Sequence, residues 1–476
     1  MASFTMEEII HATGGTVLCA TPRARVRGVT TDSRQVKRGD LFVALKGPHV
    51  DGHRFVKGAI ADGAVGVMIS ETAWASISSW IHRRQRTYAS ASLCVIGVDD
   101  SLKAYQDLAS YHRCRFSIPL IALTGSNGKT TAKEMVSHVL ATRWRTMKTH
   151  GNFNNRIGVP HTLLRMTHRY KAAVIEMGVD QEGQTTRLCE IARPTVGVIT
   201  NVGPDHLEFF GTIDASARAK GELLPALPSD GVAVLNADDA YYKDFTRQVR
   251  CRMLSFGFSP RAEVRASNVV LNRQGAQFRL HLPHRTRTTH VQLRMAGQHN
   301  VSNALAGAAV GHALGVAAND IAVGLGTMRA ASMRSQIHRV GGVTFVYDCY
   351  NANPASMEAG VDLLVDLARG NRTIAVLGEM RELGVGEASF HEEVGRYVAK
   401  KDIAYLIVCG KLGTMLADGA RKEGMPASAI FDVKQVSDAA TVLQGLVRRG
   451  DVVLLKASRG VQMEHVLDFV ARTKKR

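Results

Sequence analysis

The sequence predicts an α/β protein built from three domains. The main observation is a repeated unit, in which a short apolar run is followed by a glycine or a polar turn and then by a helical pattern. The apolar runs lie at 118–123, 172–175, 196–199, 232–235, 344–347, 374–377, 406–408 and 452–455. Short buried strands that alternate with helices are typical of parallel sheets covered on both faces.

Two changes in this pattern suggest the domain boundaries. The first hundred residues contain mixed short strands and a Gly-rich segment, GDLFVALKGPHVDGH, and a second change lies near Ala330, before a new strand at Val343. A chain of 476 residues is too long for one compact core. We therefore predict a small mixed α/β domain over 1–100, a central α/β domain over 101–330 and a Rossmann-like α/β domain over 331–476.

The composition is that of a globular protein without a membrane span. The N-terminal segment MASFTMEEIIHATGG lacks the apolar core of a signal peptide, and the most apolar long stretch, 304–326, is interrupted by His312, Asn319 and Asp320. Seven scattered cysteines form no CxxC pair, which is typical of reduced thiols. We therefore expect a cytoplasmic protein that does not insert into membranes.

The net charge of +18 admits two interpretations. One is a nucleic-acid binder, and the other is a protein whose small ligands are polyanions. Lys and Arg are spread along the chain, aromatic residues make up only 6%, and no basic tail is present. We therefore expect no nucleic-acid partner, although a nucleic-acid-stimulated ATPase stays open as a distant alternative.

The most specific motif is LTGSNGKTT at 123–131, which begins at the last residue of the apolar run 118–123. A strand, a glycine loop and a helix start bring backbone N–H groups around one point, where the helix dipole favours an anion. Gly125 and Gly128 let the backbone approach phosphate, Lys129 can neutralise phosphate charge, and Thr130 can offer a hydroxyl to Mg²⁺. Leu123 stands where the usual pattern has glycine, so a helix-capping turn is the alternative. The motif favours a central P-loop mononucleotide-binding domain for ATP or GTP.

Three later side chains could complete a metal site. Glu176 follows an apolar run, His206 follows another, and Lys220 lies in the probable helix around ARAKGEL. Each alone has an ordinary explanation as a capping carboxylate, a packed histidine or a surface lysine. On consecutive units of the sheet that carries the phosphate loop, they are expected to converge. Carboxylate, imidazole and hydroxyl ligands suit Mg²⁺ or Mn²⁺, which phosphoryl transfer to a carboxylate requires.

Together these motifs resemble the Mur ligase family. TGSNGKTT, EMG, ITNVGPDHLEFFGT and ARAKGEL occur in the order and spacing of that family, and the resemblance runs from about residue 26 to about 467. It implies an ATP-dependent amide ligase whose three domains bind a UDP-linked precursor, ATP and an amino compound. A substrate carboxylate would take the γ-phosphoryl group, and an amine would attack the resulting acyl phosphate.

Further segments resemble the branch that adds D-alanyl-D-alanine to UDP-N-acetylmuramoyl-tripeptide in peptidoglycan synthesis. They are THGNFNNRIGVP (149–160), GQHNVSNALAGAAV (297–310), DCYNANPASM (348–357), LGEMRELG (377–384) and KASRGVQMEHVL (456–467). YNANP is the most telling, because the preceding ligase of the pathway has a different segment there. Sister ligases that add one amino acid, and a noncatalytic nucleotide-binding scaffold, remain alternatives. We expect a monomer.

The resemblance also implies a role for individual residues at the nucleotide. The ATP phosphates would be held by Gly125, Ser126, Asn127, Gly128, Lys129, Thr130 and Thr131. Two magnesium ions would be bound by Thr130, Glu176, His206 and a carbamylated Lys220. From the remaining segments, Asn300 would lie near the adenine, Arg334 would reach the phosphates, Asp348 would bind the ribose, and Asn351 and Asn353 would shape the same turn.

The catalytic residues implied in this way are Lys129, His206, Lys220 and Arg334. On the precursor side, Ser33 and Arg34 would meet the uridine diphosphate, and the central domain would contribute Asn152, Asn154 and Asn155. Three positions depart from the family pattern: Arg156 stands where an acidic residue is common, Ala457 where glycine is common, and Glu379 where aspartate is common. These departures affect local substrate contacts.

Overall fold

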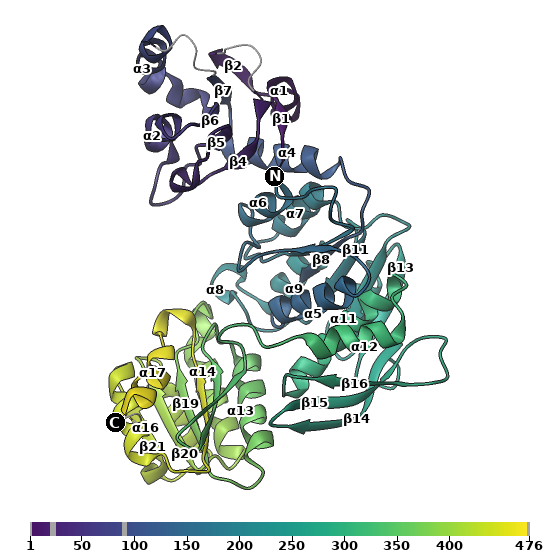
Figure 1. The fold of residues 1–476 in the computed structure, drawn as a ribbon. Helices are drawn as coiled ribbons and strands as arrows, with labels where there is room; N and C mark the ends of the chain where they lie inside the picture. The colour runs from purple at the N-terminus through teal and green to yellow at the C-terminus, as the bar shows by residue number, and fades with distance from the viewer. Residues whose placement is uncertain (1, 20–24, 88–92, 474–476) are drawn as a thin grey trace. The chain divides into compact units, whose positions relative to one another are not determined.

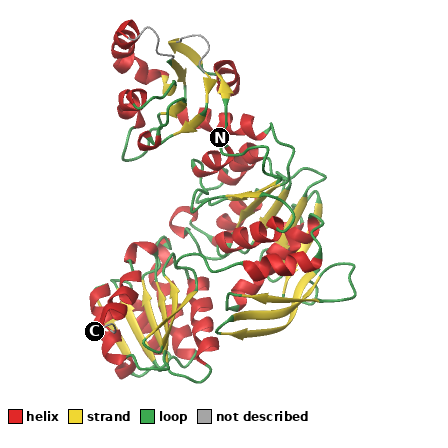
Figure 2. Cartoon of the chain, in the orientation of Figure 1, coloured by secondary structure: helices red, strands yellow, loops and turns green. Residues whose placement is uncertain are grey.

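The structure is a computed structural model that describes residues 2–19, 25–87 and 93–473 (Figure 1). Helices and strands alternate along most of the chain, as the colours of Figure 2 show. Contacts divide the chain into two compact units. One consists of Met1–Ala122, Arg145–Gly178 and Thr186–Thr195, and the other of Leu123–Trp144, Val179–Thr185 and Val196–Arg476.

The N-terminal part of the first unit has a five-stranded sheet with the order β2-β7-β6-β5-β4. Strands β4 to β7 are parallel, and β2 pairs antiparallel with β7 at the edge, which confirms the predicted mixed α/β domain. A separate antiparallel pair is formed by β1 and β3. The elements are β1 (Phe4–Thr5), α1 (Met6–Thr13), β2 (Thr16–Cys19), β3 (Arg25–Val26), β4 (Gly28–Thr30), β5 (Asp40–Val43), α2 (Val56–Ala61), β6 (Gly66–Ser70), α3 (Trp74–Thr87) and β7 (Cys94–Val98).

Helix α4 (Ser101–Arg113) is tied to the rest of the first unit by buried side chains. Asp100 caps its first turn, and the His112 ring contacts the Met166 carbonyl at 3.0 Å. Arg113 is buried and donates to the Ala192 carbonyl. Nearby elements are β9 (Thr146–Lys148), α6 (Gly158–Leu163), β10 (Ala172–Glu176) and α7 (Gln184–Ala192), with β9 and β10 paired in parallel.

The central nine-stranded sheet has the order β16-β15-β14-β13-β12-β11-β8-β10-β9. Strands β11 to β14 are parallel, and β14, β15 and β16 form an antiparallel ribbon. The expectation of parallel sheets did not include this ribbon. The strands are β8 (Leu120–Thr124), β11 (Val196–Ile199), β12 (Val232–Asn236), β13 (Arg252–Gly257), β14 (Val264–Asn272), β15 (Gly275–His281) and β16 (Thr289–Leu293), and the helices are α5 (Lys129–Ala141), α8 (Leu207–Phe210), α9 (Ile213–Gly221), α10 (Tyr242–Thr246), α11 (Gln298–Ala313) and α12 (Ala318–Thr327).

The C-terminal sheet has six strands with the order β17-β18-β22-β19-β20-β21. All pairs are parallel except the edge pair of β17 and β18, which confirms the predicted Rossmann-like domain. The strands are β17 (Gln336–Val340), β18 (Val343–Asp348), β19 (Thr373–Gly378), β20 (Tyr405–Cys409), β21 (Ile430–Val433) and β22 (Val452–Lys456), and the helices are α13 (Pro354–Ala368), α14 (Glu387–Lys400), α15 (Gly413–Lys422), α16 (Val436–Leu446) and α17 (Glu464–Thr473).

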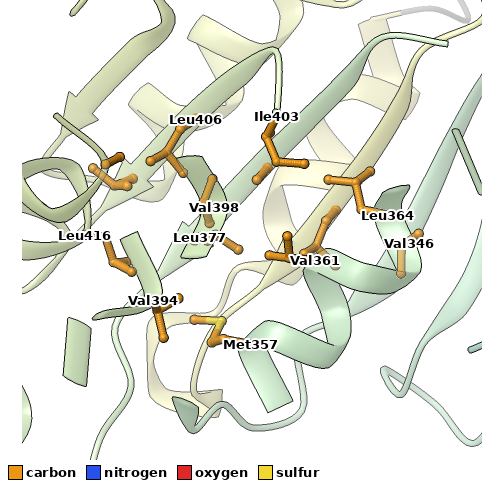
Figure 3. Close-up of a cluster of buried hydrophobic side chains, with 14 of the residues drawn as sticks. Val346, Met357, Val361, Leu364, Leu377, Val394, Val398, Ile403, Leu406 and Leu416 are labelled. Atoms are coloured by element: carbon orange, nitrogen blue, oxygen red, sulfur yellow. The ribbon is translucent and has the colours of Figure 1, made fainter. Parts of the chain in front are cut away.

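Two apolar cores cover the faces of this sheet, because successive strand residues point to opposite sides. Val346 and Leu377 belong to the core that includes α13, α14 and α15, shown in Figure 3. Phe345 and Val376 belong to the other core, which includes α16 and α17. Among the described residues, no helix is long and apolar enough to cross a membrane. The most apolar stretch, 304–326, spans most of α11 and α12 with a turn between them.

The core under α13 provides a matched stability test, because the helix carries two valines one turn apart that differ in burial. Val361 is fully buried, whereas Val365 is 37% exposed. Val361→Ala should lower the free energy of opening of the β19 amides by about 2 kcal/mol, through lost burial and a residual cavity. Val365→Ala should change it by less than about 0.5 kcal/mol. Native-state hydrogen exchange measures both, and equal effects would contradict this account of the core.

Candidate active site

The phosphate loop joins the end of β8 to the first turn of α5 in the conformation that its glycines predict. Gly125 has φ +140° and Gly128, the residue before α5, has φ +79°. A Cβ on Gly125 would clash with the Thr200 hydroxyl, and one on Gly128 would clash with the Asn303 amide. Both positions therefore need glycine for the backbone conformation and for the close approach of a neighbour.

Backbone and side-chain hydrogen bonds fix the loop between these glycines. The Ser126 and Asn127 N–H groups donate to the backbone and side-chain oxygens of Asn201, at 2.8 and 2.9 Å. The Thr200 hydroxyl donates to the Asn127 carbonyl at 2.6 Å. Lys129 donates to the carbonyls of Gly125 and Ser126. The ammonium is therefore held over the loop, and no side chain of the described residues caps the N-terminus of α5.

A buried charge cluster lies directly beneath this loop. Asp205 Oδ1 accepts from the Ser126 hydroxyl at 2.6 Å, from Lys220 Nζ at 3.0 Å and from the Ser216 hydroxyl at 3.1 Å. Lys220 also donates to Ser216. Lys220 is 1% exposed and Asp205 is 6% exposed. One carboxylate oxygen thus connects the phosphate loop to α9, where Lys220 lies as predicted.

Burial and charge act in opposite directions on this pair. Burial raises the pKa of Asp205, but the positive charges of Lys220 and Lys129 outweigh it and hold that pKa below its ordinary value. Burial lowers the pKa of Lys220 to about 8, with Asp205 opposing and Lys129 adding to the effect. Asp205 Oδ2 is buried and has no hydrogen-bond partner among the described residues. This oxygen is oriented as an acceptor that a cation would satisfy.

His206 follows Asp205 in the chain and contacts Glu382, a residue of the C-terminal part. Its Nδ1 lies 2.5 Å from Glu382 Oε2, and the Glu208 N–H donates to the Glu382 carbonyl at 3.1 Å. His206 and Glu382 both have positive φ, +52° and +66°. The hydrogen bond with His206 lowers the pKa of Glu382, although burial opposes it. A carboxylate therefore orients the imidazole that the sequence marked as a metal ligand.

The turn after β18 also reaches the phosphate loop. Asn353 Nδ2 donates to Asn127 Oδ1 at 3.0 Å, while its own Oδ1 accepts from Ser356 N at the start of α13. Nearby, Asp348 Oδ2 accepts from Lys456 Nζ at 2.7 Å, and Lys456 also donates to the Asn351 carbonyl. Asn351 and Asn353 thus lie in one short connection between β18 and α13, and their place at the nucleotide stays a prediction.

Two predicted nucleotide residues make other contacts. The Arg334 guanidinium lies 4.0 Å from the centre of the Tyr350 ring. Asn300 is buried in the first turn of α11 and donates to the Ala296 carbonyl at 2.7 Å. Their contacts with ATP therefore stay predictions.

The predicted residues of the first unit form separate small clusters. Glu176 is buried at the end of β10 and accepts from Asn154 Nδ2 at 2.9 Å, and Asn154 follows Asn152 in a tight turn. Asn155 Oδ1 accepts from the N–H groups that begin α6. The loop that carries the three asparagines is thereby ordered around the Glu176 carboxylate.

At the N-terminal sheet, Ser33 and Arg34 lie in a single 3-10 turn, Ser33–Gln35, in which the Arg34 N–H donates to the Asp32 side chain. Arg34 is exposed and pairs with both Asp32 oxygens at 2.9 Å. The hydrogen bond with Arg34 lowers the pKa of Asp32 to about 2. Binding of uridine diphosphate here stays a prediction.

Comparisons with known proteins agree with the resemblance. The models named Mur ligase family, catalytic domain; Mur ligase middle domain; and Mur ligase, glutamate ligase domain match residues 25–113, 123–311 and 333–459. The UDP-N-acetylmuramoyl-tripeptide–D-alanyl-D-alanine ligase of Bacillus subtilis is 33% identical over 98% of both chains. The chain belongs to the Mur ligase family. The Escherichia coli ligase of the same name is also 33% identical, over 98% of both chains.

Solved structures of Mur ligases have the same fold. MurF from Acinetobacter baumannii aligns with a TM-score of 0.88 and 30% identity over 99% of both chains. MurF ligase from Thermotoga maritima in complex with ADP aligns with a TM-score of 0.81 and 26% identity, over 94% of this chain and 98% of that chain. A UDP-N-acetylmuramoyl-L-alanyl-D-glutamate–2,6-diaminopimelate ligase is 17% identical with a TM-score of 0.56, which shows the fold alone.

Four residues of this Mur ligase site were missing from the sequence prediction. Asp205 and Ser216 complete the charge cluster, Asn303 contacts Gly128, and Glu382 orients His206. Asp205 had a local signal, because it directly precedes His206. Within residues 2–19, 25–87 and 93–473, no group of three or more His, Cys, Asp and Glu side chains is arranged to hold a metal. The predicted metal set contains only two such residues, Glu176 and His206, and it stays a prediction.

The glycine at the start of α5 provides a test of the loop. Gly128→Ala should weaken ATP binding about tenfold or more, because a methyl group would displace Asn303 and distort the loop. Gly183→Ala is the matched control, since Gly183 has φ +84° but nothing within 4 Å of an added Cβ. It should leave ATP affinity unchanged. Calorimetric titration with ATP compares them, and similar losses in both would mean that backbone strain, not the Asn303 contact, is responsible.

Proposed function

We propose that this Mur ligase joins D-alanyl-D-alanine to UDP-N-acetylmuramoyl-tripeptide with ATP, in the synthesis of peptidoglycan precursor. The observation that carries the proposal is that relatives with this named activity are 33% identical over 98% of the chain. The ordered phosphate loop supports ATP as the energy source, as does the ADP complex of the Thermotoga protein. The seven free thiols support a reducing compartment, and we place the reaction in the cytoplasm.

The reaction has two steps. A carboxylate oxygen of the tripeptide attacks the γ-phosphorus of ATP, so that ADP leaves and an acyl phosphate forms. The dipeptide amine then attacks the acyl carbon, loses a proton, and expels inorganic phosphate as the amide forms. Lys129, held at the loop, stabilises the charge of the transferred group, with Arg334 as a second cation. No enzyme nucleophile is needed.

Magnesium is the cofactor that this chemistry requires, and it would screen the anionic groups that meet. The buried, unpartnered Asp205 Oδ2 supports a cation beside the loop. Residues proposed to hold two ions are Thr130, Glu176, His206 and Lys220. A Lys220 ammonium would repel such ions, whereas a carbamate on the same nitrogen would attract them. Burial makes this conversion easier, because the lowered pKa of Lys220, about 8, increases the fraction of neutral amine that can react with CO₂.

The remaining residues are proposed to bind substrates. The nucleoside side of the ATP site would be formed by Asn300, Asp348, Asn351 and Asn353. The hydrogen bond from Asn353 to Asn127 in the phosphate loop supports this placement of Asn353. Ser33 and Arg34 would meet the uridine diphosphate. Asn152, Asn154 and Asn155 would face the precursor, and the ordering of their loop around Glu176 supports this.

A phosphate-release assay tests the reaction directly. With ATP, Mg²⁺ and UDP-N-acetylmuramoyl-tripeptide, release should require D-alanyl-D-alanine, and the product should be heavier by the dipeptide less water. Lys129→Ala should reduce turnover by about 10³-fold or more, because it removes a cation that stabilises the transition state. Release triggered instead by a single amino acid would assign the chain to a sister ligase. Release that is indifferent to either substrate would contradict ligase activity.

Labelling with ¹³C-bicarbonate tests the carbamate. The wild-type chain should show a carbamate carbon signal that increases as pH rises from 7 to 9, because neutral Lys220 becomes more abundant as pH passes its pKa of about 8. Lys220→Arg should lose the signal, since the guanidinium does not form it. Lys133→Arg removes another buried lysine, which is 1% exposed, and should keep the signal. A signal that survives in Lys220→Arg would contradict the assignment.

A further inference from the structure

A second cationic site lies away from the phosphate loop. It is a cavity of about 500 Å³ formed by the turn between β14 and β15, by β17 and by the C-terminal end of α13, which are parts of one compact unit. Three of its six lining residues are arginines and the other three are amides. The lining residues are Asn272, Arg273, Gln274, Arg339, Arg369 and Asn371.

Backbone geometry fixes two of the arginines at this cavity. Asn272 and Gly275 pair across a two-residue hairpin turn that contains Arg273, and Arg369 follows α13 with φ +49°. Each of these arginines donates to a carbonyl on the other segment, Arg273 Nε to Leu367 and Arg369 Nη2 to Leu271, both at 3.1 Å. A guanidinium has five N–H donors, so one anchoring bond leaves most of them for a ligand.

The charges at the cavity are unbalanced. None of Arg273, Arg339 and Arg369 forms an ion pair with a carboxylate of the described chain, and no lining residue is acidic. Arg372, close by in sequence, shows the contrast, because it pairs with both oxygens of Asp451 at 2.6 and 3.0 Å. Three guanidinium groups around one cavity repel each other, and a bound anion would remove this repulsion.

We propose that this arginine pocket, Asn272 to Gln274 with Arg339, Arg369 and Asn371, binds a small anion with two or more phosphate groups. Guanidinium forks match phosphate oxygens two at a time, and amide N–H groups add neutral donors. The volume is that of a small-ligand site, and every lining residue carries a charged or amide side chain. The lining contains no aromatic side chain on which bases of a single strand could stack, so the pocket favours a free polyphosphate over a nucleic acid.

The three arginines of this pocket contribute part of the net charge of +18. The proposal also has a structural consequence, since the ligand would contact the hairpin at residues 272–274 and the C-terminal sheet domain together. The bound anion would therefore add a third connection to the two arginine–carbonyl hydrogen bonds.

Equilibrium dialysis with radiolabelled pyrophosphate tests this pocket in the full chain. At about 0.1 M salt, where screening over about 10 Å suppresses loose surface binding, the wild-type chain should bind one pyrophosphate more than the pocket variants. Arg339→Gln is the cleanest variant, because Arg339 is exposed on β17 and its side chain forms no hydrogen bond with the described residues. It should weaken the second site about tenfold or more, as should Arg273→Gln.

Two controls separate this site from other phosphate binding. Arg279→Gln, an exposed arginine on β15 outside the pocket, should leave both sites unchanged. Lys129→Ala should weaken pyrophosphate binding at the phosphate loop and leave the affinity of the arginine pocket unchanged. Equal stoichiometry and affinity in the wild-type, Arg339→Gln and Arg273→Gln chains would overturn the proposal. So would a site that takes a single-stranded oligonucleotide but not pyrophosphate.

Discussion

The buried ion pair of Lys220 and Asp205 is the interaction on which the rest of the site depends. Its carboxylate also accepts from Ser126 in the phosphate loop and from Ser216 on α9, so loop and helix share one charged acceptor. Desolvating a charge costs several kcal/mol, and removing one partner of such a pair typically costs about 3–5 kcal/mol. Any chemical change at Lys220 therefore alters the charge balance directly beneath the phosphate loop.

Much of the fold could be predicted because its signals are local. The alternation of apolar runs and helices predicted both parallel sheets, and the strand before Gly125 with the helix after Gly128 predicted the phosphate loop. The antiparallel ribbon β14–β16 was not predicted, because its strands are half exposed and their alternating polar residues resemble surface loops. The sheet order itself depends on tertiary packing and had no local signal.

The site was only partly predictable, because only some of its residues lie in local sequence motifs. Lys129 and Lys220 lie in motifs with recognisable neighbours, whereas Asn303 and Glu382 contribute through contacts with segments far away in the chain. Glycine at 128 could be explained from sequence by backbone freedom, but the crowding by Asn303 could not. Asp205 was overlooked because sequence does not reveal which of two adjacent polar residues turns inward, and here Asp205 is buried while His206 is one-third exposed.

The side chain of Asn353 links the phosphate loop to the start of α13. Its oxygen caps α13 and its amide nitrogen reaches Asn127, so both ends of one small group are occupied. The cap keeps the first turn of α13 intact whether or not the second bond is present. The Asn127 contact could therefore be lost without loss of the helix cap, while the hydrogen bond from Arg273 to the Leu367 carbonyl would still hold the other end of α13 to the β14–β15 hairpin.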